Sequence, residues 1–170
     1  MPGYAMMPPY QSHGSVSMMS SISGLVAIAL YLLASGMLVT RLAQGPAEGG
    51  GGRTRILLIG TAAILIHAAM LYPSILTDSG LNLGILNAAS LIALLTAALL
   101  LVAAFREPVE NLGIAVFAVA AISIGLLLIY PEKSTGSSLT WQLQTHILIS
   151  LLAYSILGLA VLQALLLAVQ

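Results

Sequence analysis

Residues 141–169 read WQLQTHILISLLAYSILGLAVLQALLLAV, a run that contains no charged side chain. An apolar helix of about 20 residues crosses about 30 Å of hydrocarbon, so this run is long enough to span a membrane. Most of its polar residues lie near the start, where His146 follows Trp141 by about one and a half helical turns. The run therefore predicts a membrane helix that carries a titratable side chain near one end.

The composition of the whole chain agrees with a membrane location. Hydrophobic residues make up 59% and charged residues 6%, with a mean hydropathy of +1.07, whereas soluble domains carry about 25% charged residues. The formal net charge of zero gives no field that would attract nucleic acid. The chain has no cysteine, which excludes disulfides, thiolate metal clusters and covalent haem attachment through cysteine.

Five apolar runs are long enough to cross a bilayer as helices. They cover roughly residues 22–40, 56–76, 83–104, 112–130 and 143–169. The connectors between them are short and rich in Gly, Pro, Ser and Asp, which favours antiparallel neighbours. We predict an all-α fold, a polytopic transmembrane helix bundle of about five spans.

The two ends of the chain differ from this pattern. Residues 1–19 lack the positive segment and the cleavage site of a signal peptide, so we expect a disordered leader or a translation start at Met18 or Met19. Residues 20–170 form the predicted transmembrane helical domain. Its last span ends without a basic or aromatic flank, and we therefore expect this domain to be incomplete at its C-terminus.

Basic residues predict the orientation, because short cytoplasmic loops hold an excess of Lys and Arg. Arg41, Arg53 and Arg55 flank the first connector and Arg106 lies in the third, whereas the fourth holds only Lys133. This places the N-terminus outside and His146 near the outer face of the membrane.

His146, Ser150 and Tyr154 follow one another at intervals of four residues and share one slowly turning helix face. In one interpretation these side chains hydrogen-bond to neighbouring helices. In the other, the neutral imidazole of His146 is a ligand for a metal or for haem iron near the outer face.

His67 lies deep in the second span, where it either bonds to a neighbouring helix or serves as a ligand or proton relay. The two histidines are expected to differ in depth by about two helical turns, which is compatible with one site that includes both. Asn87 and Ser90, three residues apart, are expected to bridge to a neighbour, and Asp78 or Ser79 to cap that helix.

The sequence has no sign of enzymatic activity. It lacks a glycine-rich phosphate loop, paired carboxylates within a span and a nucleophile elbow. We therefore predict a protein that is not an enzyme.

Two ordered motifs resemble the cytochrome c assembly membrane proteins, the superfamily that includes the CcsA, CcmC and HemX types. The first is Trp141-x-x-x-x-His146-Ile-x-x-Ser150-Leu-x-x-Tyr154. The second runs from His67-Ala68 to Asp78-Ser-Gly-x-Asn82-Leu83-x-x-Leu86-Asn87-x-x-Ser90-Leu91 and looks most like the YpjD-type branch of bacterial inner-membrane proteins.

The resemblance implies a multi-pass protein of the bacterial inner membrane that binds or delivers haem for cytochrome c biogenesis. Family members have about eight spans. By position, His146 matches an axial ligand of non-covalent haem b, with His67 as a secondary candidate and with Trp141 and Tyr154 on the same helix as His146. The implied partners are the lipid bilayer, haem and other cytochrome c maturation proteins, without nucleic acid. Two alternatives remain: a membrane transport or cation-homeostasis component, and a structural membrane subunit without a cofactor.

Overall fold

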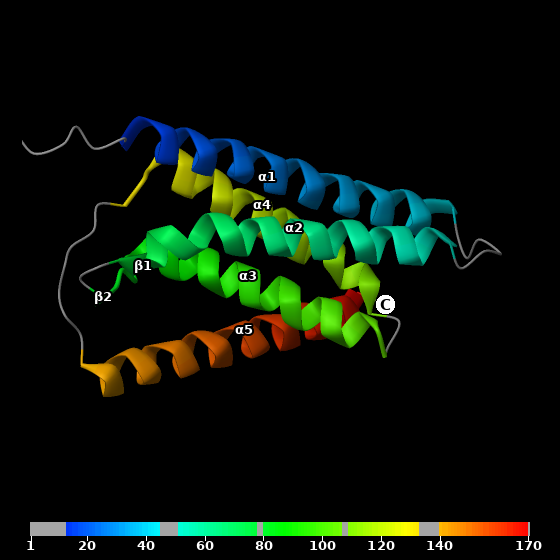
Figure 1. Ribbon diagram of the computed structural model, residues 1–170. Helices are drawn as coiled ribbons and strands as arrows, with labels where there is room; N and C mark the ends of the chain where they lie inside the picture. The colour runs from blue at the N-terminus through cyan, green and yellow to red at the C-terminus, as the bar shows by residue number, and fades with distance from the viewer. Residues whose placement is uncertain (1–12, 45–50, 78–79, 107–108, 133–139, 170) are drawn as a thin grey trace, which may run out of the picture.

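The computed structural model describes residues 13–44, 51–77, 80–106, 109–132 and 140–169 (Figure 1). The helices are α1 (His13–Gln44), α2 (Gly51–Ile75), α3 (Ile85–Ala104), α4 (Gly113–Ile129) and α5 (Trp141–Val169), with a 3-10 turn, η1, at Glu110–Leu112. Strands β1 (Leu76–Thr77) and β2 (Gly80–Leu81) pair antiparallel between α2 and α3. Gly80 supports this tight turn, because its φ of 113° is a conformation that other residues rarely adopt.

The predicted all-α bundle is confirmed. Within the described residues, four helices are long and apolar enough to cross a membrane, namely α1 from Met18 onward, α2, α3 and α5. The fourth expected span is also a helix, but η1 forms its first turn and α4 keeps 17 residues. At 1.5 Å per residue α4 is about 25 Å long, near the lower limit for a span.

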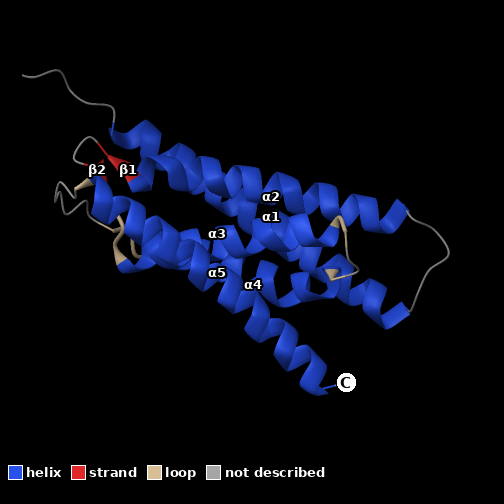
Figure 2. Ribbon diagram, turned by 90° about the horizontal axis from the view of Figure 1, so that it is seen from below, coloured by secondary structure: helices blue, strands red, loops and turns tan. Residues whose placement is uncertain are grey.

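Helices α1 to α4 form a closed ring. Helix α1 packs against α2 and α4, and α3 packs against the same two helices on the other side. Helix α5 lies outside this ring and packs mainly along α3, which places it far from α1 in Figure 1. Figure 2 shows α5 extending beyond the ring toward the C-terminus. Much of the α5 surface is thus left open.

Small residues are frequent on the inside of the ring, and many large apolar residues face outward. Ala27, Ala34, Ala63, Ala97 and Ala120 are buried, whereas many leucines and isoleucines are exposed. This is the distribution expected in lipid, where helices associate by close packing and large side chains face the hydrocarbon.

Helices α1 and α4 are in close contact at Gly113, where an added methyl group would require the Leu38 side chain to shift. A Cβ there would lie 2.7 Å from Cδ1 of Leu38. Beside this contact, the Ser35 hydroxyl donates to the carbonyl oxygen of Ile114 over 3.1 Å. Both features join α1 to the start of α4.

The two ends of the bundle differ in their content of basic residues. Arg41, Arg53 and Arg55 lie where α1 ends and α2 begins, and Arg106 follows α3 at the same end. The Arg53 guanidinium donates to the carbonyl oxygen of Ala104, the last residue of α3. The opposite end holds the β-hairpin and the start of α5.

The first helix begins at His13, inside the segment for which a leader was expected, and residues 1–12 lie outside the described residues. The expected capping residues Asp78 and Ser79 also lie outside them.

Candidate functional site

The centre of the ring contains a polar cluster built from three helices. The His67 side chain of α2 is 0% exposed. Its Nδ1 lies 3.3 Å from the hydroxyl of Tyr31 on α1, and its Nε2 lies 2.9 Å from the hydroxyl of Ser90 on α3. The Tyr31 ring meets the His67 ring edge to face at 5.8 Å and packs against Phe117 of α4 at 5.6 Å. Helices α1, α2 and α3 therefore meet at one imidazole, and α4 joins the cluster through the Tyr31 ring.

Both nitrogens of His67 are used within the protein. A neutral imidazole donates through one nitrogen and accepts through the other, and hydroxyl groups can serve either nitrogen. Two proton arrangements therefore satisfy the Tyr31–His67–Ser90 cluster, which leaves no ring nitrogen for a metal in this geometry. Of the interpretations of His67, interhelical bonding is the one that these distances describe.

A second polar cluster caps α3. The Glu132 carboxylate, which follows α4, accepts hydrogen bonds from the backbone amides of Leu86 (2.9 Å) and Asn87 (3.1 Å). The first amides of a helix lack partners within the helix, and negative charge is favourable there. Gly84 permits this approach, because a Cβ at that position would clash with the Glu132 carboxylate. The cap of α3 thus comes from a residue more than 40 positions away.

Asn87 extends this second cluster to α2. Its side-chain amide donates to the carbonyl oxygens of Asn82 (3.1 Å) and Ser74 (3.4 Å). Ser90 reaches α2 as well, through His67, so the expected bridging of Asn87 and Ser90 to a neighbouring helix is confirmed. Sequence reasoning did not identify Tyr31 or Glu132 as partners.

The orientation of α5 follows from Ser155. Its hydroxyl donates to Leu151 of its own helix (2.8 Å) and to the carbonyl oxygen of Ile92 on α3 (3.3 Å). Ser155 is therefore on the inner face of α5. His146 precedes it by nine residues, which at about 100° per residue is the opposite face, about 13 Å nearer the hairpin end.

The four predicted site residues are not brought together. His146 is exposed, and within the described part of the chain no hydrogen bond reaches its side chain. Trp141 (71% exposed) and Tyr154 (61% exposed) are rotated from it by about 140° and about 80° around α5. His67 lies inside the ring, so the structure does not form the shared site that the sequence left open.

Among the described residues, His146, Ser150 and Tyr154 make no hydrogen bond to a neighbouring helix, contrary to the first interpretation of this face. Ser150 and Thr145 donate to carbonyl oxygens of their own helix, at 2.8 Å and 2.9 Å. The residue that does bond across to α3 is Ser155, one position after Tyr154. The residues around Ser155 in the sequence do not indicate that it contacts α3.

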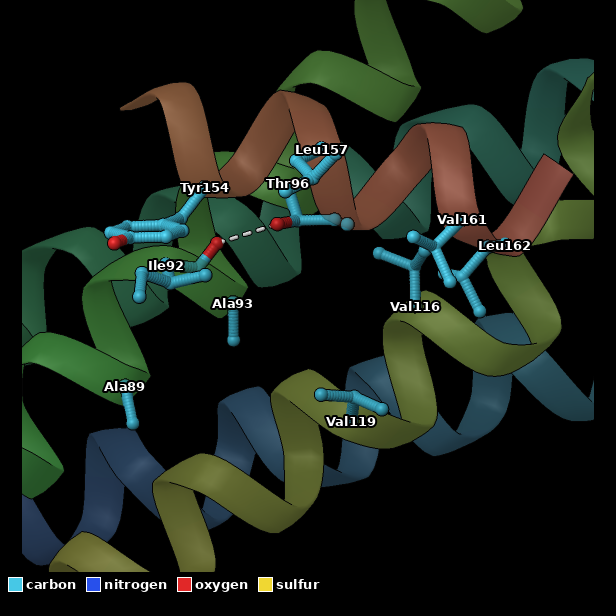
Figure 3. Close-up of a pocket in the computed structure, with 11 residues that line it drawn as sticks. Ala89, Ile92, Ala93, Thr96, Val116, Val119, Tyr154, Leu157, Val161 and Leu162 are labelled. Atoms are coloured by element: carbon cyan, nitrogen blue, oxygen red, sulfur yellow. Dashed lines mark hydrogen bonds between the residues drawn. The ribbon is translucent and has the colours of Figure 1, made fainter. Parts of the chain in front are cut away.

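A groove of about 440 Å³ lies between α3, α4 and α5. Figure 3 shows Tyr154 at one end of it, Val161 and Leu162 of α5 at the other, and Val116 of α4 across from Ala93 of α3. The Thr96 hydroxyl at its wall is bonded to the carbonyl oxygen of Ile92 over 2.7 Å. The groove is thus apolar and begins about two turns deeper than His146.

No group of three or more His, Asp or Glu side chains that could hold a metal ion occurs among the described residues. A metal ion at His146 would therefore not find three such donors in this part of the chain.

The fold is that of a polytopic helical membrane protein. Its helices are apolar and long enough to span a membrane, polar side chains are paired inside the ring, and basic residues lie at one end. The chain is homologous to the inner membrane protein YpjD. It is 33% identical to YpjD of Escherichia coli K12 over 150 residues, which is 86% of this chain and 56% of the relative. The YpjD proteins of strains O6:H1 and O157:H7 match to the same extent.

This chain therefore spans little more than half the length of the curated relatives it matches. No protein-family profile matches the chain, and no solved structure is significantly similar to it.

Proposed function

We propose that this inner-membrane protein belongs functionally with the cytochrome c assembly proteins and that His146 is an axial ligand for haem. One observation carries the proposal: unlike His67, His146 is exposed, on the outward face of a helix that packs mainly on α3, and no hydrogen bond reaches its side chain among the described residues. The motif Trp141-x-x-x-x-His146-x-x-x-Ser150-x-x-x-Tyr154 supports it by its resemblance to the haem-handling helix of that superfamily.

The donor set around His146 fits one axial position of a haem. The imidazole is exposed and unpaired among the described residues, and apolar side chains of α5 continue below it. Haem would supply the iron chemistry, and the protein would supply ligation and an apolar surface. His67, enclosed between Tyr31 and Ser90, is not available as the second ligand in this geometry. A second ligand would have to come from outside the described residues.

The same proposal orients the protein in the membrane. Arg41, Arg53, Arg55 and Arg106 share one end of the bundle, and short cytoplasmic segments are rich in arginine. The opposite end, with the start of α5, then faces outward. His146 then lies about 8 Å below that start, near the outer face.

The alternative of a cation path gains no support from the arrangement of the polar groups. His67, Asn87 and Ser90 bond to other protein groups, and none of them lines the α3–α4–α5 groove. If the protein were a structural subunit without a cofactor, the purified chain would contain no haem. The haem measurement described below therefore distinguishes this alternative from the proposal. We also propose that the protein binds and presents haem without catalysing a reaction of its own.

The experiment is a haem measurement on purified protein. The chain would be expressed under haem-replete conditions, purified in detergent, and compared with His146→Ala by its Soret band and pyridine hemochrome. We expect haem in the wild type and a loss of most of it in His146→Ala. A wild type without haem would contradict the proposal, and an unchanged spectrum in His146→Ala would remove His146 as the ligand.

A further inference from the structure

Helix α5 differs from the ring helices in where its amide and imidazole side chains point. Within the spans of α2 and α3, His67 is 0% exposed and Asn87 is 1% exposed, and both are hydrogen-bonded. On α5, His146 and Gln163 are exposed, and no hydrogen bond reaches either side chain within the described residues. Hydrocarbon offers no hydrogen bonds, so an exposed amide within a span calls for a protein partner.

Gln163 lies within the apolar depth of the bundle. Ser155 is level with Ile92 of α3, and α5 runs in the same direction as α3. Gln163, eight residues further along, is therefore level with Leu100, four residues before the end of α3. It lies about 6 Å before the arginine end of α3 and inside Trp141–Ala168, the part of α5 that is long and apolar enough to span a membrane.

A groove beside Gln163 continues the α3–α5 interface. Its volume is about 320 Å³. Leu99, Leu100 and Ala103 of α3 form one wall, and Ile156, Ala160 and Gln163 of α5 form the other. Gln163 supplies the polar group of an otherwise apolar groove.

We propose that this groove, the Gln163 groove, receives an additional membrane helix that hydrogen-bonds to Gln163. The helix belongs to a polypeptide equivalent to the part of YpjD that this chain does not match. Two observations favour this occupant: an acyl chain cannot pair with an amide, and the relatives carry 44% of their length (100% minus 56%) outside the match. The proposal does not depend on haem binding.

The exposure of α5 allows a test by photocrosslinking. The photoreactive residue p-benzoyl-phenylalanine would replace Ala160, and the matched control would carry it at Leu33, exposed on α1 away from α5. Each variant would be co-expressed in E. coli membranes lacking native YpjD. The probe is the unmatched part of K12 YpjD, separately tagged.

We expect a crosslinked product carrying both tags from position 160 and none from position 33. Gln163→Leu should lower its yield about fivefold, as expected for loss of one interhelical hydrogen bond. Because Gln163 bonds to nothing in the described chain, the variant should keep the level and thermal stability of the chain expressed alone.

Four outcomes would overturn the proposal. They are no product from position 160, equal products from both positions, a yield unaffected by Gln163→Leu, and a product of two copies of this chain in place of the probe. Lipid adducts alone from position 160 count as the first of these. A second copy would identify the groove as a homodimer interface.

Discussion

Nε2 of His67 on α2 lies 2.9 Å from the hydroxyl of Ser90 on α3, although the two residues are 23 positions apart in the chain. Tyr31 completes the cluster from α1. Three helices thus meet through one imidazole in the middle of an apolar ring, where an unpaired polar group has no water to replace its partner.

Loss of the Ser90 hydroxyl should destabilise the ring. Ser90→Ala leaves one nitrogen of His67 unpaired in the core, and we expect a cost of about 1–2 kcal/mol. Thermal or SDS unfolding in detergent would measure this. In the His67→Leu background the same Ser90→Ala change should cost much less, because the two residues act as one unit. Additive effects would show that the Ser90–His67 bond contributes nothing to stability.

Gly84 and Glu132 should behave as a coupled pair. Glu132→Ala removes the cap of α3 and should cost about 0.5–2 kcal/mol of unfolding free energy. Gly84→Ala should have a similar effect, because its Cβ would displace the carboxylate. In a Glu132→Ala background, Gly84→Ala should be nearly neutral, as measured by the same unfolding assay. An equal cost in both backgrounds would contradict this mechanism.

Gly113 and Gly125, both in α4, form a matched comparison. A Cβ at Gly113 would lie 2.7 Å from Leu38, whereas a Cβ at Gly125 would meet nothing within 4 Å. Gly113→Ala should therefore separate α1 from α4 and lower the stability by about 1–3 kcal/mol. Gly125→Ala should raise it slightly, because Ala favours helix over Gly by about 1 kcal/mol. Equal effects of the two changes would show that the Leu38 side chain accommodates the added methyl group without cost.

The proposed orientation predicts which cysteines are accessible from outside. Tyr130→Cys lies at the hairpin end and Leu42→Cys at the arginine end, and both positions are exposed. A membrane-impermeant maleimide should label Tyr130→Cys in intact spheroplasts and label Leu42→Cys only after permeabilisation. The reverse pattern would place the N-terminus in the cytoplasm.

The spans were predictable because hydropathy is a local property. The second and third runs, expected at 56–76 and 83–104, are helices at Gly51–Ile75 and Ile85–Ala104. Their ends shift for reasons that lie elsewhere in the chain: α3 starts at Ile85, where Glu132 supplies the cap. Because Glu132 is distant in sequence from the start of α3, no local sequence pattern at that helix start predicts the cap.

The polar sites were predictable in part. The burial of His67 and the bridging by Asn87 and Ser90 follow from polar residues placed in apolar runs. The partner Tyr31 was missed because its spacing to His67 depends on how α1 packs against α2. His146 was identified by its motif, but its outward orientation became visible only through the contact of Ser155 with Ile92.

The haem content of two histidine variants tests whether His146, and not His67, is the haem ligand. His146→Ala and His67→Leu would be purified in parallel with the wild type, and the haem bound per protein would be determined by pyridine hemochrome. We expect His146→Ala to lose most of its haem and His67→Leu to keep it at lower thermal stability, because His67 bonds to Tyr31 and Ser90. Loss of haem in His67→Leu with full retention in His146→Ala would show that His67, and not His146, holds the haem.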